Sequence, residues 1–188
     1  KKEIDSYLKK MKTLFDRYNI IVRNELSGNE HLYMYRADFQ SIIFNLFTNS
    51  LKAIVRLRTK KKLKSNHKNY IKIYADQTLM TPSKYISIVL SDDGTGVRKG
   101  IQDRIFDLFI SDYNPEDDKL RGSGLGLTLL REITQNYDGD IKLVKSDFNP
   151  GASFCFYFDR KSVKIPDSVK LKKPVKKTRK KPSRKKTR

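Results

Sequence analysis

The spacing of apolar residues alternates between helical and strand-like periods along this chain, and this alternation restricts the possible folds. Apolar residues recur every three or four positions in segments that begin near Ile4, near Asp38 and near residues 124–126, which predicts three amphipathic helices. Asp38 is expected to cap the second helix. Short apolar and β-branched segments between turn residues predict strands at residues 19–26, 70–75, 85–90, 140–145 and 152–158.

The order of these segments is helix, strand, helix, two strands, helix and two strands. We therefore expect an α/β two-layer sandwich in which helices cover one face of a mixed sheet. The chain has 188 residues, of which 37% are hydrophobic, enough for one such domain with an appendage. We assign residues 19–160 to the domain, residues 1–18 to an N-terminal helix that links it to an upstream domain, and residues 161–188 to a basic, disordered tail.

Composition excludes several classes of protein. The single Cys155 rules out a disulfide framework, and one thiol with two His residues has no metal-site spacing. No apolar run approaches the roughly 18 residues of a membrane span, and no signal-peptide pattern opens the sequence. These features indicate an intracellular, cytoplasmic domain. Because the sequence begins at Lys1 without a Met, we expect it to be a fragment of a longer protein.

The second predicted helix carries two carboxamides on one face. Asn45 and Asn49 are four positions apart and Lys52 follows three positions later, so the three side chains lie close together on a helix. Amide oxygens bind hard cations such as Mg²⁺, whose other ligands are water and phosphate oxygens, and a lysine offers a point charge to a phosphate. A solvent-facing polar stripe is the alternative interpretation of this motif alone.

A segment rich in Asp and Gly follows the predicted strand at residues 85–90. Asp92 at the strand end can accept a hydrogen bond from the exocyclic amine of a base, while Gly94 and Gly96 let the backbone approach a ligand closely. An Asp-Gly hairpin turn explains this segment equally well in isolation.

Alternating glycines precede the third predicted helix. Gly122, Gly124 and Gly126 leave backbone N–H groups free at a helix N-terminus, where the helix dipole also favours anions such as phosphates. A Rossmann-type site fits poorly, because no βαβ unit with a downstream acidic residue surrounds these glycines. No Walker Gly-Lys-Ser/Thr follows them either.

Four segments in this order resemble the motifs of the GHKL ATPase family, which includes sensor histidine kinases, gyrase, MutL and a heat-shock chaperone. NLFTNSLKA at residues 45–53 is similar to the N box, and DDGTGV at 92–97 to the first glycine box. IFDLFIS at 105–111 is similar to the F box, and GSGLGL at 122–127 to the second glycine box. The resemblance spans residues 20–158. It implies the Bergerat fold, with a mainly antiparallel sheet, and the binding of ATP and Mg²⁺.

The resemblance also implies a role for each matched residue. Asn49 would bind Mg²⁺ with the help of Asn45, and Lys52 would reach a phosphate. Asp92 would hydrogen-bond adenine, and residues 111–121 would form the lid. The other residues implied to shape the nucleotide site, including the two F-box aromatics that anchor the lid, are Gly94, Gly96, Phe106, Phe109, Arg121, Gly122, Gly124, Gly126 and Leu127.

The residue at position 45 distinguishes two branches of the family. In the branch resembling gyrase and MutL this position is usually a Glu that acts as general base on water, whereas the side chain of Asn45 has no useful basicity. Asn45, Lys52 and a short lid resemble sensor histidine kinases of two-component signalling, which pass the γ-phosphoryl group to a partner His. We therefore expect phosphoryl transfer, with Asn45 and Lys52 as the catalytic residues.

The phosphoacceptor is expected outside this sequence. Only His31 and His67 are present, and neither lies in a predicted helix of the kind that carries the acceptor in these kinases. The acceptor would then belong to a domain upstream of Lys1 or to another protein, and the missing regions would also provide a dimer interface.

Three features depart from the family pattern. Ser50 replaces the usual Ala of the N box, and Asp107-Leu108 stands where the F box usually has Glu-Pro. The polar, basic stretch at residues 56–69 is longer than expected after the N-box helix, and we interpret it as a solvated loop or a frayed helix end. None of these changes removes a group that ATP binding requires.

The tail at residues 161–188 contains 14 of the 41 Lys and Arg residues and one acid, Asp167. Dense positive charge favours polyanions through counterion release, so nucleic acid is the first candidate partner, followed by an anionic membrane surface and a nuclear-import receptor. A solubilising tail without a partner is the remaining alternative. The second functional hypothesis is accordingly a nucleotide-gated ATPase module that grips nucleic acid through this tail.

Overall fold

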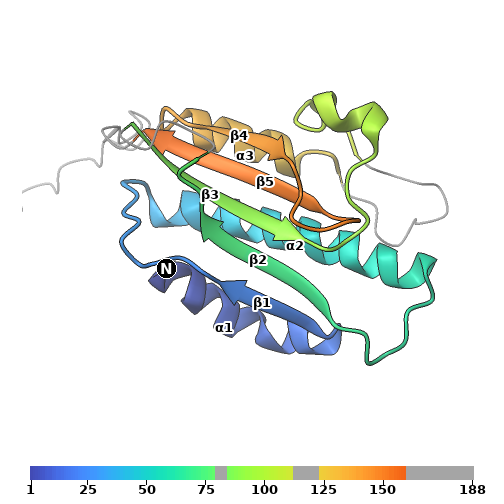
Figure 1. Cartoon of the computed structure of the whole chain (residues 1–188). Helices are drawn as coiled ribbons and strands as arrows, with labels where there is room; N and C mark the ends of the chain where they lie inside the picture. Colours follow the sequence, from blue (N-terminus) through green and yellow to red (C-terminus); the bar gives the residue numbers. More distant parts are fainter. Residues whose placement is uncertain (79–83, 112–122, 160–188) are drawn as a thin grey trace, which may run out of the picture.

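The structure, a computed structural model, describes residues 1–78, 84–111 and 123–159 (Figure 1). The tail and the predicted lid, apart from Ser111, lie outside these residues. The elements follow the predicted order, with one additional 3₁₀ helix. They are α1 (Lys2–Arg17), β1 (Ile20–Asn24), α2 (Arg36–Lys60), β2 (Asn69–Ala75), β3 (Tyr85–Asp92), η1 (Lys99–Arg104), α3 (Gly126–Gln135), β4 (Asp140–Val144) and β5 (Ala152–Asp159).

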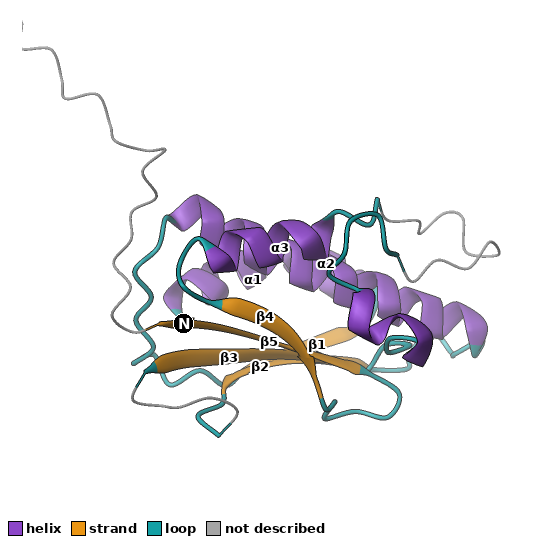
Figure 2. Cartoon of the chain, turned by 90° about the horizontal axis from the view of Figure 1, so that it is seen from above, coloured by secondary structure: helices purple, strands orange, loops and turns teal. Residues whose placement is uncertain are grey.

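The five strands form one mixed sheet in the order β1-β2-β3-β5-β4. β1 and β2 are parallel and are connected through α2, whereas the other three neighbouring pairs are antiparallel. Figure 2 shows α1, α2 and α3 together on one side of the sheet. The predicted two-layer sandwich with a mainly antiparallel sheet is therefore confirmed.

The hydrophobic core lies between the helices and the inner face of the sheet. Successive side chains of a strand point to opposite faces, so alternate residues of β2, β3 and β5 enter this layer, and α2 has more buried residues than α1 or α3. The largest fully buried side chains are Phe47, Phe156, Ile4, Leu26, Ile42, Ile43, Leu46, Ile54, Ile71, Ile73, Ile88 and Leu90.

Helix α1 shares this core. Its residues Ile4 and Phe15 are buried, and two of its aromatic rings flank Phe47 of α2. The ring centroids of Tyr7 and Phe15 lie 5.5 Å and 5.7 Å from that of Phe47. The first helix of the chain thus packs with α2 as one layer against the sheet.

The N-terminal end of α2 differs from the predicted one. The prediction that Asp38 caps the helix was wrong, because Tyr35 occupies the N-cap position and Asp38 lies in the first turn. There its carboxylate accepts a hydrogen bond from the hydroxyl of Tyr137 at 2.5 Å, which ties α2 to the end of α3. At the other end, α2 continues to Lys60, so residues 56–60 form the helix end that was one of the two interpretations of this stretch, and the loop begins after them.

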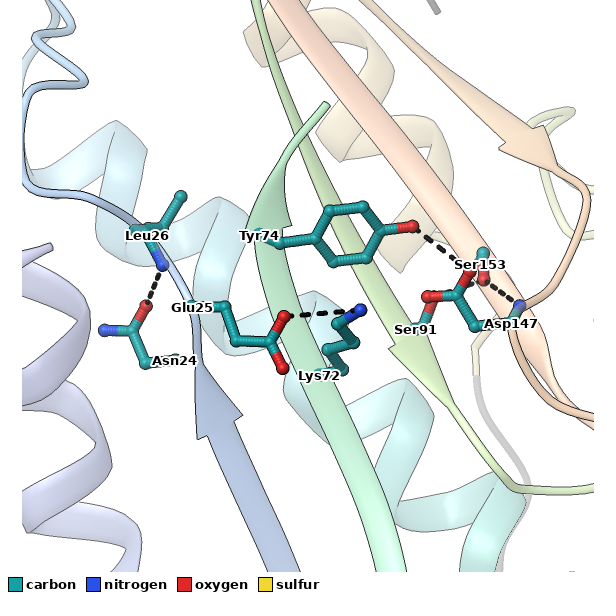
Figure 3. Close-up of polar contacts among 8 residues, drawn as sticks. All are labelled: Asn24, Glu25, Leu26, Lys72, Tyr74, Ser91, Asp147 and Ser153. Carbon is teal, nitrogen blue, oxygen red and sulfur yellow. Dashed lines mark hydrogen bonds and ion pairs between the residues drawn. The ribbon is translucent and has the colours of Figure 1, made fainter. Parts of the chain in front are cut away.

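The outer face of the sheet carries a polar network instead of helices (Figure 3). The hydroxyl of Tyr74 on β2 donates to Asp147 Oδ1 at 3.3 Å, and that of Ser91 on β3 donates to Asp147 Oδ2 at 3.2 Å. Ser153 on β5 lies against Ser91 and accepts a hydrogen bond from the backbone N–H of Asp147 at 3.4 Å. The network joins the three central strands to the β4–β5 turn and gives the buried hydroxyls of Ser91 and Ser153 their partners.

Phe47→Ala tests whether α1, α2 and the sheet form one core. Removing a buried Phe from between two aromatic rings leaves a cavity, so we expect the free energy of unfolding to fall by about 3–5 kcal/mol. The matched control is Phe44→Ala on the same helix, where the side chain is 52% exposed, and it should change stability by no more than about 0.5 kcal/mol. Urea denaturation measures both values, and equal effects would contradict the packing described here.

Candidate nucleotide-binding site

A cavity of about 450 Å³ lies between α2, the segment after β3, and the N-terminal end of α3. It brings together residues from all four of the sequence motifs, with Ile105, Ile110 and Ser111 coming from the segment at 105–111. Residues predicted from the sequence that line it are Asn45, Asn49, Lys52, Asp92, Gly96, Gly124, Gly126 and Leu127. Gly94 lies next to the cavity through its contact with Asp92. Arg121 and Gly122 fall outside the described residues.

Asp92 is the deepest charged group of the cavity. It ends β3, which runs between β2 and β5, so its side chain is only 1% exposed. The hydroxyl of Ser50 donates to Oδ2 at 2.8 Å, and the backbone N–H of Gly94 donates to Oδ1 at 3.0 Å. Burial raises the pKa of Asp92 to about 7, while both hydrogen bonds favour the charged form and counteract part of that rise.

The backbone after Asp92 is pressed against α2, and this requires a residue without a side chain. A Cβ atom added to Gly94 would lie 2.6 Å from the Cβ of Ala53 and 2.8 Å from Asp92 Oδ1. Any larger residue would therefore push the turn away from the helix. The neighbouring N–H of Thr95 donates to the carbonyl oxygen of Ala53 at 3.3 Å, which fixes the turn on α2.

Successive turns of α2 place polar groups along one wall of the cavity. Asn45, Asn49 and Lys52 all line it, as expected for positions that share one helix face. The Asn45 amide nitrogen donates to the carbonyl oxygen of Ser41 at 2.9 Å. Its amide oxygen faces Gly126, where an added Cβ would lie 3.1 Å from it. This wall therefore offers amide oxygens and a cation, the groups that suit a metal-bound phosphate chain.

The opposite wall is the N-terminal end of α3. The helix begins at Gly126 after Leu125 at the N-cap position, so its first N–H groups are available to an anion. Gly124 has a φ of 73°, and an added Cβ would lie 2.6 Å from the backbone carbon of Phe109. The glycine is thus required both for its left-handed conformation and for close contact with residues 109–110.

The two F-box aromatics do not line the cavity. Phe106 packs edge-on against Phe154 of β5 with ring centroids 6.4 Å apart, beneath the guanidinium group of Arg131. Phe109 is 73% exposed. Phe106 therefore packs behind Phe154, which lines the cavity, while Phe109 lies at the surface beside Gly124.

The structure adds residues that sequence reasoning did not assign to the site. Arg56 lines the cavity one helical turn after Lys52, and its four-residue spacing from Lys52 was the signal that could have revealed it. Ala152 and Phe154 come from β5 and depend on strand pairing, which sets Asp92 opposite Ala152. Ser50, noted in the sequence only as a departure from the family, contacts Asp92 directly.

Comparison with known sequences identifies the family of the chain. Residues 35–162 match the sequence model of the family described as "Histidine kinase-, DNA gyrase B-, and HSP90-like ATPase". The chain belongs to this ATPase family. The matched range includes α2, the turn after Asp92 and the glycines before α3, so it contains the whole cavity.

Curated relatives of the chain are sensor kinases. It is 28% identical over 165 residues to the autoinducer 2 sensor kinase/phosphatase LuxQ of Vibrio parahaemolyticus, a match covering 83% of this chain and 17% of the relative. It is 31% identical over 130 residues to the histidine protein kinase SaeS of Staphylococcus aureus, covering 69% of this chain and 33% of the relative. The chain thus spans a third or less of each relative and is a histidine kinase-like ATPase catalytic domain.

Solved structures agree on the fold. The catalytic domain of the histidine kinase ThkA superposes with a TM-score of 0.64 at 18% identity, covering 84% of this chain and 92% of that one. The mycobacterial sensor histidine kinase MprB superposes with a TM-score of 0.62 at 16% identity, covering 84% of this chain and 93% of that one.

Among the described residues, no helix combines the length and apolar character that a membrane span needs.

Ser50→Ala tests the hydrogen bond to Asp92. Loss of the hydroxyl should raise the Asp92 pKa further above its present value of about 7, so fewer molecules carry the carboxylate at neutral pH. If the pKa rises by about one unit, the ionised fraction of Asp92 at pH 7 falls from about one half to about one tenth. We therefore expect the affinity for ATP near neutral pH to fall roughly fivefold. The ATP affinities of the variant and the unmodified protein should become equal at higher pH, where Asp92 is ionised in both.

The control for this variant is Ser87→Ala, which removes another buried hydroxyl from β3, away from the cavity. Calorimetric titration with ATP at several pH values measures both variants. A loss of affinity that does not change with pH would contradict the role of Ser50 in setting the ionisation of Asp92.

Proposed function

We propose that this domain binds Mg-ATP in the cavity and transfers the γ-phosphoryl group to a histidine on another domain or protein. The single observation that carries this proposal is Asn45, which lines the cavity beside Gly126 and contributes only an amide. An amide cannot accept a proton from water, so self-contained hydrolysis lacks its base at this position. The kinase names of the relatives agree with transfer to a protein acceptor.

The adenine ring is proposed to bind at Asp92. An ionised carboxylate accepts the hydrogen bond of an exocyclic amine, and the two donors that already hold Asp92 leave it other lone pairs for the ligand. The apolar side chains of Val97, Ile101 and Phe154 line the same cavity and would contact the flat faces of the base.

The triphosphate is proposed to extend towards α3 and the polar wall of α2. N–H groups at the start of α3 would bind phosphate oxygens, and Lys52 and Arg56 would supply positive charge. Asn49, assisted by Asn45, would hold Mg²⁺, since amide oxygens are suitable ligands for this cation. When bound, Mg²⁺ neutralises charge that develops on the transferred group. The chain's own groups would position the γ-phosphate for attack by an external imidazole.

The two histidines of the chain lack the surroundings expected of the acceptor. His31 and His67 are both exposed and lie in loops, not on helices, and neither lines the cavity. The proposed acceptor therefore comes from outside residues 1–188. Its docking beside the γ-phosphate would complete the reaction site, because positioning supplies most of the catalysis in phosphoryl transfer.

Asp92→Asn tests the adenine contact. The amide would turn a donor towards the exocyclic amine, itself a donor, so we expect ATP affinity to fall at least about tenfold through an unpaired buried polar group. The neutral amide is easier to bury than a carboxylate, so the melting temperature should not drop. Calorimetry with ATP and a thermal melt measure both properties, and undiminished affinity would remove Asp92 from the site.

Labelled ATP tests the reaction class. Incubation of the longest natural form of the protein with γ-labelled ATP should give acid-labile, base-stable phosphate on a histidine, whereas the isolated domain should release phosphate only slowly. Asn49→Ala should abolish labelling, and a double His31→Ala, His67→Ala variant should retain it. Rapid phosphate release by the domain alone, with no phosphohistidine formed, would instead identify an ATPase.

A further inference from the structure

The net positive charge of residues 1–160 is concentrated in one short stretch. Residues 56–68 contain seven Lys and Arg residues and no acid. Outside this stretch, the first 160 residues carry twenty Lys and Arg residues and twenty acids. Like charges packed this densely repel one another and lower the stability of the fold. The stretch therefore calls for an explanation beyond that of a general basic surface.

The helix end explains only part of this charge. Arg58 and Lys60 occupy the last turn of α2, where cations interact favourably with the helix dipole. The remaining lysines continue into the loop that leads to β2. All four of them, Lys61, Lys62, Lys64 and Lys68, are exposed, and none forms an ion pair with a described residue.

Arg58 holds this loop in a defined shape. Its guanidinium group donates to the carbonyl oxygens of His67, Lys64 and Ser65 at 2.8, 3.2 and 3.1 Å. It also donates to Asn69 Oδ1 at 2.9 Å, at the start of β2. One half-buried cation thus fixes the backbone of the loop from which the exposed lysines project.

Lys62 occupies a backbone position that normally belongs to glycine. Its N–H donates to the carbonyl oxygen of Thr59 at 3.2 Å, and the N–H of Leu63 donates to that of Arg58 at 3.0 Å. This is a Schellman helix end, and Lys62 takes its left-handed position with a φ of 47°. Glycine or asparagine adopts that conformation with less strain. A lysine at this position therefore lowers the stability of the loop, and residues in strained backbone conformations of this kind cluster at functional sites.

We propose that Lys61, Lys62, Lys64 and Lys68 form a docking surface for the phosphate backbone of double-stranded nucleic acid. We call these four residues the α2–β2 lysine surface. Closely spaced, unpaired ammonium groups bind a phosphate lattice by releasing its counterions, without reading sequence. The surface starts five residues, or about 7.5 Å, along the chain from Arg56, the last α2 residue that lines the nucleotide cavity, and none of its four lysines lines that cavity.

The side chains around this surface favour a duplex over the other polyanions. Residues 56–69 contain no Phe, Tyr or Trp, so bases of a single strand would find no stacking partner. The exposed large apolar residues of the described structure all lie elsewhere in the chain, whereas surface helices that enter a lipid interface present apolar side chains beside their cations. Exposed lysines without neighbouring exposed apolar or aromatic side chains therefore fit the outer phosphates of a duplex best.

A charge-matched pair of variants tests this proposal in the full chain. One carries Lys61→Gln, Lys62→Gln, Lys64→Gln and Lys68→Gln, and the control carries Lys9→Gln, Lys10→Gln, Lys99→Gln and Lys145→Gln at other exposed positions. Both have the same net charge and the same tail. Fluorescence anisotropy with a labelled DNA duplex over a range of salt concentrations gives the affinity and its salt dependence for each protein.

The two variants should differ clearly. For the α2–β2 variant we expect at least about tenfold weaker binding, and a slope of log affinity against log salt that is smaller by roughly 0.9 for every phosphate that the variant no longer neutralises. The control should stay within about twofold of the unmodified chain. Equal reductions in both variants would overturn the proposal, as would unchanged duplex binding with selectively weakened binding to phosphatidylserine vesicles.

Lys62→Gly separates binding from folding. Glycine relieves the left-handed backbone, so the melting temperature should rise, while the removal of one ammonium group from the duplex should lower the affinity by about twofold to fivefold. A residue with a purely structural role would not show these opposite changes. A rise in melting temperature with unaltered affinity and salt slope would remove Lys62 from the surface and contradict the proposal.

Discussion

The arrangement of this domain depends on a carboxylate buried at the end of its central strand. Asp92 is enclosed because β3 lies between β2 and β5 and because α2 crosses above it. Burying an ionisable group without partners is costly, and the hydroxyl of Ser50 and the N–H of Gly94 provide those partners. The same contacts hold the turn after β3 against the helix. The position of the turn, the depth of the cavity and the orientation of the carboxylate therefore have one cause.

Helix α2 contributes to the core, to the nucleotide cavity and to the support of the α2–β2 lysine surface. One face fills the core with residues such as Phe47, and another lines the cavity with Asn45 and Asn49. The loop that follows its C-terminal end carries the α2–β2 lysine surface, and Arg58 in the last turn of α2 holds that loop. Because Arg58 ties the loop to the helix, a change in how α2 packs on the sheet would move the nucleotide wall and the loop together.

Much of the fold and part of the site could be predicted because their signals are local. Apolar periodicity indicated the order of helices and strands, and the four-residue spacing on α2 placed Asn45 and Asn49 together. The contact between Ser50 and Asp92 could not be predicted, since it joins residues 42 positions apart. The pairing of β5 with β3, which brings β5 to the cavity, could not be predicted from the sequence either. The N-cap of α2 was misplaced because Asp38 bonds to Tyr137 from the far end of α3.

The most direct test of this account is a crystal structure with Mg²⁺ and a non-hydrolysable ATP analogue. We predict the exocyclic amine of adenine within hydrogen-bonding distance of Asp92, the phosphates at the N-terminal end of α3, and the metal bound by Asn49. A base bound without contact to Asp92, or phosphates directed away from α3, would contradict the proposed site.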